Sequence, residues 1–272
     1  MKKLIYIGVI AICLTSCQKN FDPLTFKPKL AINGYTATKQ VAASSLVAYW
    51  AFDGSTADSV SNTSGTAVGT GFTVGLLNQA LQGADKSYLL FNTPASIQSL
   101  TSFTVTSWVH TPQNTNGIVG ILDIANASAQ WGNLSIYFEN GGTATSGNLK
   151  VHLNNNGVEA TFGNFAVANP WDKWINVAVS YDETSSTLKV YVNGSVLATK
   201  VQTGYGALHF QNASKMVFGT VQFQTTPSLT TASKPSILAS YLTGQLDEVR
   251  VYNKALSDVE ISSIVKLQSR GK

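Results

Sequence analysis

Short segments in which apolar and polar residues alternate recur every ten to fifteen residues from Leu46 onward, with turn residues between them. A period of two places the apolar side chains of a strand on one face of a sheet. Asn193-Gly194 predicts a two-residue hairpin turn, and the Asn/Gly run at 154–157 predicts another turn. On this basis the sequence predicts strands at 103–109, 134–138, 149–153, 175–181 and 188–192.

One segment near the end of the chain has helical periodicity. Its apolar residues lie mostly at helical spacing from Ser257 to about Leu267, with Ser257 in the N-cap position and Glu260 in the capping-box position. The Thr/Ser/Pro-rich stretch at 220–241 has a looser pattern and predicts a long loop. Many short strands and one short helix predict an all-β fold, either a β-sandwich or a jelly roll.

The first seventeen residues are organised differently. Met1-Lys2-Lys3 precedes an apolar run from Leu4 to Leu14, which is the order of an export signal and is too short to span a bilayer. The small residues before Cys17 resemble the lipobox of bacterial lipoproteins. This resemblance implies a signal peptide at 1–16, acylation of Cys17 and a stable membrane anchor. An ordinary secretory signal with a chance cysteine is the alternative.

The residues after Cys17 predict a location and a tether. Gln18 stands where an aspartate commonly retains lipoproteins at the inner membrane. The resemblance therefore implies a bacterial envelope protein of the outer membrane, on either the periplasmic or the outer face. Residues 17–45 have no sustained period and predict an extended, mobile tether, although Ile32 is apolar enough to pack on the domain.

Composition excludes several classes of protein. The chain has 18 basic and 14 acidic residues among 272, and they are scattered without a basic stripe, which argues against nucleic acid as a partner. No later apolar stretch is long enough to span a membrane. Cys13 lies in the apolar run, so the processed chain keeps one cysteine and has no disulfide.

Six phrases occur in register along most of the chain. They lie at 46–54, 79–83, 103–109, 174–182, 188–194 and 244–257, and include AYWAFDG, INVAVSYD and GQLDEVRVYNKALS. Together they resemble the laminin-G-like members of the concanavalin A-like lectin/glucanase superfamily over about 46–267. The resemblance implies one domain at 46–272, a jelly roll with one convex and one concave antiparallel sheet.

The acidic residues do not form a catalytic pattern. Glycoside hydrolysis normally requires two carboxylates about 5–10 Å apart. Retaining glucanases of the superfamily carry them as Glu-x-Asp-x-Glu on one strand, and the sequence has no such motif. The three histidines lack metal-ligand spacing, and no Gly-x-Ser-x-Gly motif occurs. We therefore expect a protein that is not an enzyme.

Two aspartates are candidates for a structural Ca²⁺ site. Relatives often bind Ca²⁺ through an aspartate after the first strand and the aspartate of the closing phrase, and the matching positions here are Asp53 and Asp247. Backbone carbonyls would supply the remaining oxygen ligands. In the alternative interpretation Asp53 caps a turn before Gly54, and Asp247 pairs with Arg250 or with a backbone amide.

Aromatic and histidine residues on the polar sides of several predicted strands indicate glycan binding. Sugars stack their C–H faces on aromatic rings, and polar side chains fix their orientation. If these strands share the concave sheet, the residues form one groove, and otherwise each is a half-buried aromatic under a loop. The candidates on strands are Trp108, His110, Tyr137, His152 and Tyr191, and Trp131, in a loop, would rim the groove.

The sequence therefore predicts a lipid-anchored, non-catalytic envelope protein that binds a glycan or polysaccharide. A protein-binding adhesion module is the first alternative, because laminin-G-like domains often have that role. A structural spacer and a glycosidase with an unfamiliar site are the others. These alternatives differ in what the concave sheet presents: aromatic rings, an apolar or charged patch, or two facing carboxylates.

Overall fold

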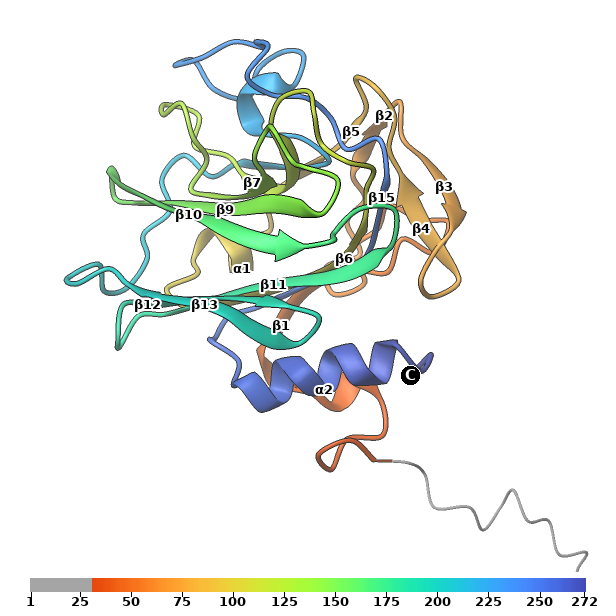
Figure 1. The fold of residues 1–272 in the computed structure, drawn as a ribbon. Coiled ribbons are helices and arrows are strands. Elements are labelled where there is room, and N and C mark those ends of the chain that lie inside the picture. The colour runs from red at the N-terminus through yellow and green to blue at the C-terminus, as the bar shows by residue number, and fades with distance from the viewer. Residues whose placement is uncertain (1–30) are drawn as a thin grey trace, which may run out of the picture.

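The structure is a computed structural model that describes residues 31–272, in which two antiparallel sheets pack face to face (Figure 1). The eight-stranded sheet has the order β13-β12-β11-β6-β15-β4-β3, and β1 pairs with the second half of β15. Its strands are β1 (Leu46–Trp50), β3 (Gly71–Val74), β4 (Gln79–Gln82), β6 (Phe103–His110), β11 (Trp174–Asp182), β12 (Thr187–Val192), β13 (Ser195–Val201) and β15 (Gln245–Tyr252).

The seven-stranded sheet has the order β10-β9-β8-β7-β14-β5-β2. Its strands are β2 (Thr66–Val68), β5 (Tyr88–Asn92), β7 (Val119–Ile124), β8 (Leu134–Phe138), β9 (Ser146–Asn155), β10 (Val158–Ala168) and β14 (Lys215–Phe218). The helices are short: α1 (Ala95–Gln98), α2 (Asp258–Gln268) and the 3-10 turns η1 (Thr38–Gln40), η2 (Ala43–Ser45) and η3 (Gln222–Gln224).

The inner faces of the two sheets form the main core. In β6 the alternation buries Phe103, Val105 and Val109 between the sheets, as the sequence predicts. Edge-to-face aromatic contacts join the sheets, with Trp50 of β1 lying 4.9 Å from Phe218 of β14 between ring centroids. The prediction of an all-β jelly-roll sandwich with a short C-terminal helix is confirmed.

Helix α2 lies against the outer face of the eight-stranded sheet (Figure 1). Ser257 caps its N-terminus in a capping box with Glu260, as predicted, and Ile261, Ile264 and Leu267 pack toward the sheet. No helix among residues 31–272 is long and apolar enough to cross a membrane.

Residues 31–45 also belong to the folded unit, which corrects their assignment to a mobile tether. Ile32 and Val41 are buried against α2 and the sheet, and the Thr38 hydroxyl donates a hydrogen bond to the main-chain oxygen of Lys272. Short turns without periodicity are hard to distinguish from an extended linker in a sequence. Every residue of the three hydrophobic clusters lies between Ile32 and Leu267. Cys17 and the signal region lie outside the described residues.

The 220–241 segment forms the long loop that the sequence predicts, with only η3 as regular structure. It packs on the outer face of the seven-stranded sheet, on the side of the sandwich away from α2 (Figure 1). Val221 and Phe223 are buried there beside Tyr137. The part of this face formed by β9 and β10 retains exposed and half-exposed side chains.

Candidate functional site

The six candidate glycan-binding residues lie on two different sheets, so the expectation of one shared groove is wrong. Trp108 and His110 belong to β6, and Tyr191 belongs to β12 of the eight-stranded sheet. Tyr137 and His152 belong to β8 and β9 of the seven-stranded sheet, next to the loop that carries Trp131. Alternation assigns a side chain to one of two faces of its strand but does not say which sheet the strand joins.

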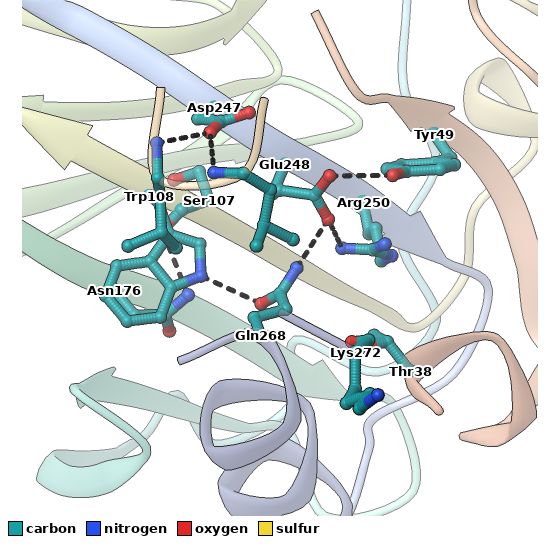
Figure 2. Close-up of polar contacts among 12 residues, drawn as sticks. Thr38, Tyr49, Ser107, Trp108, Asn176, Asp247, Glu248, Arg250, Gln268 and Lys272 are labelled. Carbon is teal, nitrogen blue, oxygen red and sulfur yellow. Dashed lines mark hydrogen bonds and ion pairs between the residues drawn. The ribbon is translucent and has the colours of Figure 1, made fainter. Parts of the chain in front are cut away.

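The candidates on the eight-stranded sheet contact other side chains of the protein. Trp108 is 5% exposed, and its indole Nε1 donates a hydrogen bond of 2.8 Å to Gln268 at the end of α2 (Figure 2). Tyr191 is fully buried under the same helix and donates to Asp258. His110 is partly exposed and lies edge-on to Trp174, with 5.6 Å between ring centroids. Because α2 covers the rings of Trp108 and Tyr191, neither offers a face to a ligand.

The members on the seven-stranded sheet form one aromatic stack. Trp131 lies almost parallel to Tyr137, at 5.2 Å and 12°, and to His152, at 5.3 Å and 27°. Phe223 contacts Trp131 in an edge-to-face arrangement, with 5.6 Å between ring centroids. Tyr137 and His152 are 2% exposed, whereas Trp131 is partly exposed. These contacts fix the orientation of the Trp131 ring.

Polar side chains surround this stack on the same face. Lys150 pairs opposite Tyr137 in the sheet and forms a 2.6 Å ion pair with Glu139. Thr161 pairs opposite His152, and its hydroxyl lies 2.9 Å from His152 Nδ1. Directly opposite residues in antiparallel strands share a face. We call the surface formed by Trp131, Glu139, Lys150 and Thr161 the Trp131 face.

A groove continues from the Trp131 face. Its volume is about 400 Å³, and it runs from Thr161 and Glu159 of β10 to the edge strand β13. Lys200 and Gln202 line its other side. A half-exposed ring beside hydrogen-bond donors and acceptors has the combination by which proteins hold sugars.

The titratable groups under Trp131 are sealed from solvent. Burial raises the pKa of Asp123 to about 7 and lowers the pKa of His152 to about 4. A Cβ atom at Gly132 would lie 2.0 Å from Asp123 Oδ1, so the main chain at Gly132 closes directly over this carboxylate. The other oxygen of Asp123, Oδ2, accepts hydrogen bonds from the Ser135 hydroxyl and from the backbone N–H of Gln222. A carboxylate that no substrate can reach does not act as a general acid.

Asp53 and Asp247 hold the turn that joins β3 to β4. Asp53 accepts hydrogen bonds of 3.0 Å from the backbone N–H of Gln79 and from the side-chain amide of Asn78. Asp247 Oδ2 accepts bonds from the backbone N–H groups at 76–77, at 2.9 and 3.1 Å. Oδ2 of Asp247 therefore bonds backbone amides, which is one of the alternatives to calcium binding that the sequence leaves open.

The other oxygen of Asp247 fits a hard cation. Asp247 Oδ1 is buried and has no hydrogen-bond partner, and burial raises the pKa of this carboxyl group to about 7. Ca²⁺ takes carboxylate and carbonyl oxygens of this kind. The described residues contain no cluster of three or more His, Cys, Asp or Glu side chains that could hold a metal. Backbone carbonyls or water would have to complete the coordination.

A buried polar network under α2 was not expected from the sequence. Glu248 accepts a hydrogen bond of 2.8 Å from the Tyr49 hydroxyl and one of 2.7 Å from Gln268, and forms a 2.6 Å ion pair with Arg250 (Figure 2). The Arg250 guanidinium lies 4.0 Å from the centroid of the Tyr49 ring. Gln268 also accepts from Trp108, so the network joins the sheet to the end of α2.

A β-bulge places these groups. The pairing of β15 with β6 shifts register between Asp247 and Arg250, and Glu248 adopts a positive φ of 54°. Leu246 and Val249 both face the core, so the two acidic residues between them share the outer side. Strict alternation would have put Glu248 in the core beside Leu246.

Residues 82–262 match the family model for the concanavalin A-like lectin/glucanases superfamily. This match covers more than half of the chain, and the chain belongs to this superfamily. No curated protein sequence matches it.

Solved structures share the fold at low sequence identity. Domain 4 of AbnA, an extracellular arabinanase from Geobacillus stearothermophilus in complex with arabinotriose, is 20% identical with a TM-score of 0.57, over 81% of this chain and 98% of that domain. The binding domain of Paraclostridial Mosquitocidal Protein 1 is 13% identical with a TM-score of 0.61, over 82% of this chain.

A structure of botulinum neurotoxin type C, whose cell entry depends on two ganglioside molecules, is 12% identical with a TM-score of 0.60, over 85% of this chain. The chain spans about half the length of the mosquitocidal and neurotoxin structures, 52% and 53% respectively.

Proposed function

We propose that the protein binds a glycan or polysaccharide on the Trp131 face and performs no catalysis there. The observation that carries this proposal is the partly exposed Trp131 ring, which stacks with Tyr137 and His152 and is bordered by polar side chains. In this proposal a sugar ring packs against the exposed part of the indole, and Lys150, Glu139 and Thr161 beside it bond the sugar hydroxyl groups. The groove toward Lys200 and Gln202 extends the site for a longer chain.

Structures of the same fold that contain carbohydrates support this proposal. The arabinanase domain is complexed with arabinotriose, and one neurotoxin binding domain is complexed with SialylT. The arabinanase domain shares the fold over nearly its whole length, and the neurotoxin domain shares it over about half. Absence of catalysis is supported by the lack of a Glu-x-Asp-x-Glu motif in the sequence, and by the burial of Asp123 under Gly132, which keeps that carboxylate from a substrate.

The proposal includes a lipid anchor at Cys17 in a bacterial envelope, on the outer membrane. Its support is the order of the first seventeen residues: two lysines, an apolar run and small residues before the cysteine. Residues 18–30 would then connect the anchor to the folded domain.

Replacing Trp131 with alanine tests the glycan proposal. We expect the Kd for a bound oligosaccharide to rise roughly 30-fold, which corresponds to about 2 kcal/mol for a central aromatic contact. Trp131→Phe should fall between wild type and alanine, because it keeps a smaller ring. The measurement is calorimetric titration with arabinan, sialylated and other oligosaccharides that a glycan array identifies.

Trp174→Ala is the matched control, since Trp174 is also partly exposed but belongs to the eight-stranded sheet. It should leave the Kd unchanged. Equal loss in both tryptophan variants, or no glycan bound by the folded wild type, would overturn the proposal. Thermal unfolding of each variant separates loss of binding from loss of structure.

We also propose that Asp53 and Asp247 bind a structural Ca²⁺ ion, and protein stability tests this proposal. Calcium at about 30 times its dissociation constant should stabilise the protein by about 2 kcal/mol. Asp247→Asn should remove this effect, because it takes a ligand charge from the site, while substitution of the exposed Asp85 should not. The measurement is thermal unfolding with Ca²⁺, Mg²⁺ or chelator. Equal stability in Ca²⁺ and chelator would contradict a calcium site.

A further inference from the structure

A groove of about 670 Å³ lies between residues 32–40 and the C-terminal end of α2. Its apolar wall includes Ile32, Ala37 and Leu267. The groove is on the α2 side of the sandwich, away from the Trp131 face (Figure 1). It takes no part in the glycan site described above.

The rim of this groove is basic. Lys39, Arg270 and Lys272 line it and are exposed, and no aspartate or glutamate is among the lining residues. None of the three forms an ion pair within residues 31–272. In α2 the acidic residues Asp258 and Glu260 are in the first turn, and Lys266 is in the last. Charge is therefore segregated along the helix, with the positive end at the groove.

The groove lies where the described chain begins. Ile32, at the start of the described chain, forms part of its wall. Only the 13 residues from Gln18 to Leu30 separate Cys17 from the domain, a reach of at most about 45 Å. Three more lysines, Lys19, Lys27 and Lys29, occur in that short stretch with one acidic residue, Asp22.

We propose that this basic groove docks the domain on an anionic lipid surface. Lys39, Arg270 and Lys272 meet lipid phosphates, and the apolar wall takes up acyl-chain surface between them. Charge complementarity supports this occupant, because basic residues near an anionic membrane attract it additively within a Debye length. The orientation follows from the sandwich: with α2 toward the membrane, the Trp131 face points away from it. The inference rests on the proposed envelope location but not on glycan binding.

Vesicle binding tests the groove without the anchor. A chain of residues 18–272 lacks Cys17 and retains all of the described hydrophobic clusters. We expect it to co-sediment with phosphatidylcholine vesicles that contain about one-third phosphatidylglycerol, and not with phosphatidylcholine alone. Lys39→Gln, Arg270→Gln and Lys272→Gln together should weaken this binding on the order of 100-fold. Rising salt should weaken the wild type more than the triple variant.

The control makes the same charge change elsewhere. Lys86→Gln, Lys173→Gln and Lys234→Gln alter three exposed lysines outside the groove and should leave most of the binding intact. Equal loss in the two triple variants, or no preference of the wild type for anionic vesicles, would overturn the proposal. A groove variant that dissociates a dimer but binds vesicles normally would assign the groove to a second copy instead. Membrane retention of full-length protein through Cys17 and glycan titrations report separately on the anchor and the Trp131 face.

Discussion

Replacing Glu248 with alanine is expected to lower the free energy of unfolding by about 3–5 kcal/mol, because it leaves Arg250 buried without a counter-charge. Arg250 is 6% exposed and lies 2.6 Å from the Glu248 carboxylate. The same substitution leaves the Tyr49 hydroxyl and the Gln268 side-chain amide without their hydrogen-bond acceptor, because both donate to Glu248. The measurement is equilibrium unfolding in urea, with the midpoint and slope fitted for both proteins.

An exposed ion pair provides the matched control. Lys189 and Asp258 lie 2.8 Å apart at side-chain exposures of 35% and 52%, and Lys189→Ala should cost less than about 1 kcal/mol. The two pairs have similar geometry and differ in burial. If Glu248→Ala cost no more than Lys189→Ala, the network would not stabilise α2 against the sheet. A double-mutant cycle with Arg250 measures the pair itself.

The sequence predicts the elements of this fold better than their assembly. Strands with clean alternation, such as Phe103–His110, and a helix with a capping box, Asp258–Gln268, are set by local patterns. Which strands become neighbours depends on contacts between distant parts of the chain. For that reason Trp108 and Tyr137, both placed on polar sides of strands, ended on opposite faces of the molecule.

The candidate site was predictable in part. Trp131, Tyr137 and His152 were among the sequence candidates, and the structure stacks all three. The Glu248 network was not predictable from alternation, because the bulge at that residue turns Glu248 out of the core and onto the same side as Asp247. An acidic residue at a predicted core position was the one signal available, since a charge there requires a partner or a bulge.

Asp123→Asn is expected to stabilise the protein above pH 7 by a few kcal/mol, up to about 4 kcal/mol, and to have little effect near pH 4. Burial raises the pKa of this carboxyl group to about 7 in the folded state, from an ordinary value of 3.8. A group with a raised folded pKa stabilises the fold fully below its unfolded pKa, and that stabilisation is lost as the pH rises through about 7. Asparagine stays neutral and retains an oxygen to accept from Ser135 and Gln222.

The test is the difference in unfolding free energy between Asp123→Asn and wild type, measured by urea unfolding from pH 4 to pH 8. Taking the difference cancels His152, whose lowered pKa acts in the opposite direction, and Asp247, whose raised pKa adds a similar slope. Asp182→Asn is the control, because a hydrogen bond from the Thr184 side chain lowers the pKa of that carboxyl group. Its stabilising contribution is present at high pH and lost in acid, so its substitution should give the opposite trend. A flat difference for Asp123→Asn would mean that solvent reaches this carboxylate beneath Trp131, and would reopen the question of a catalytic acid on this face.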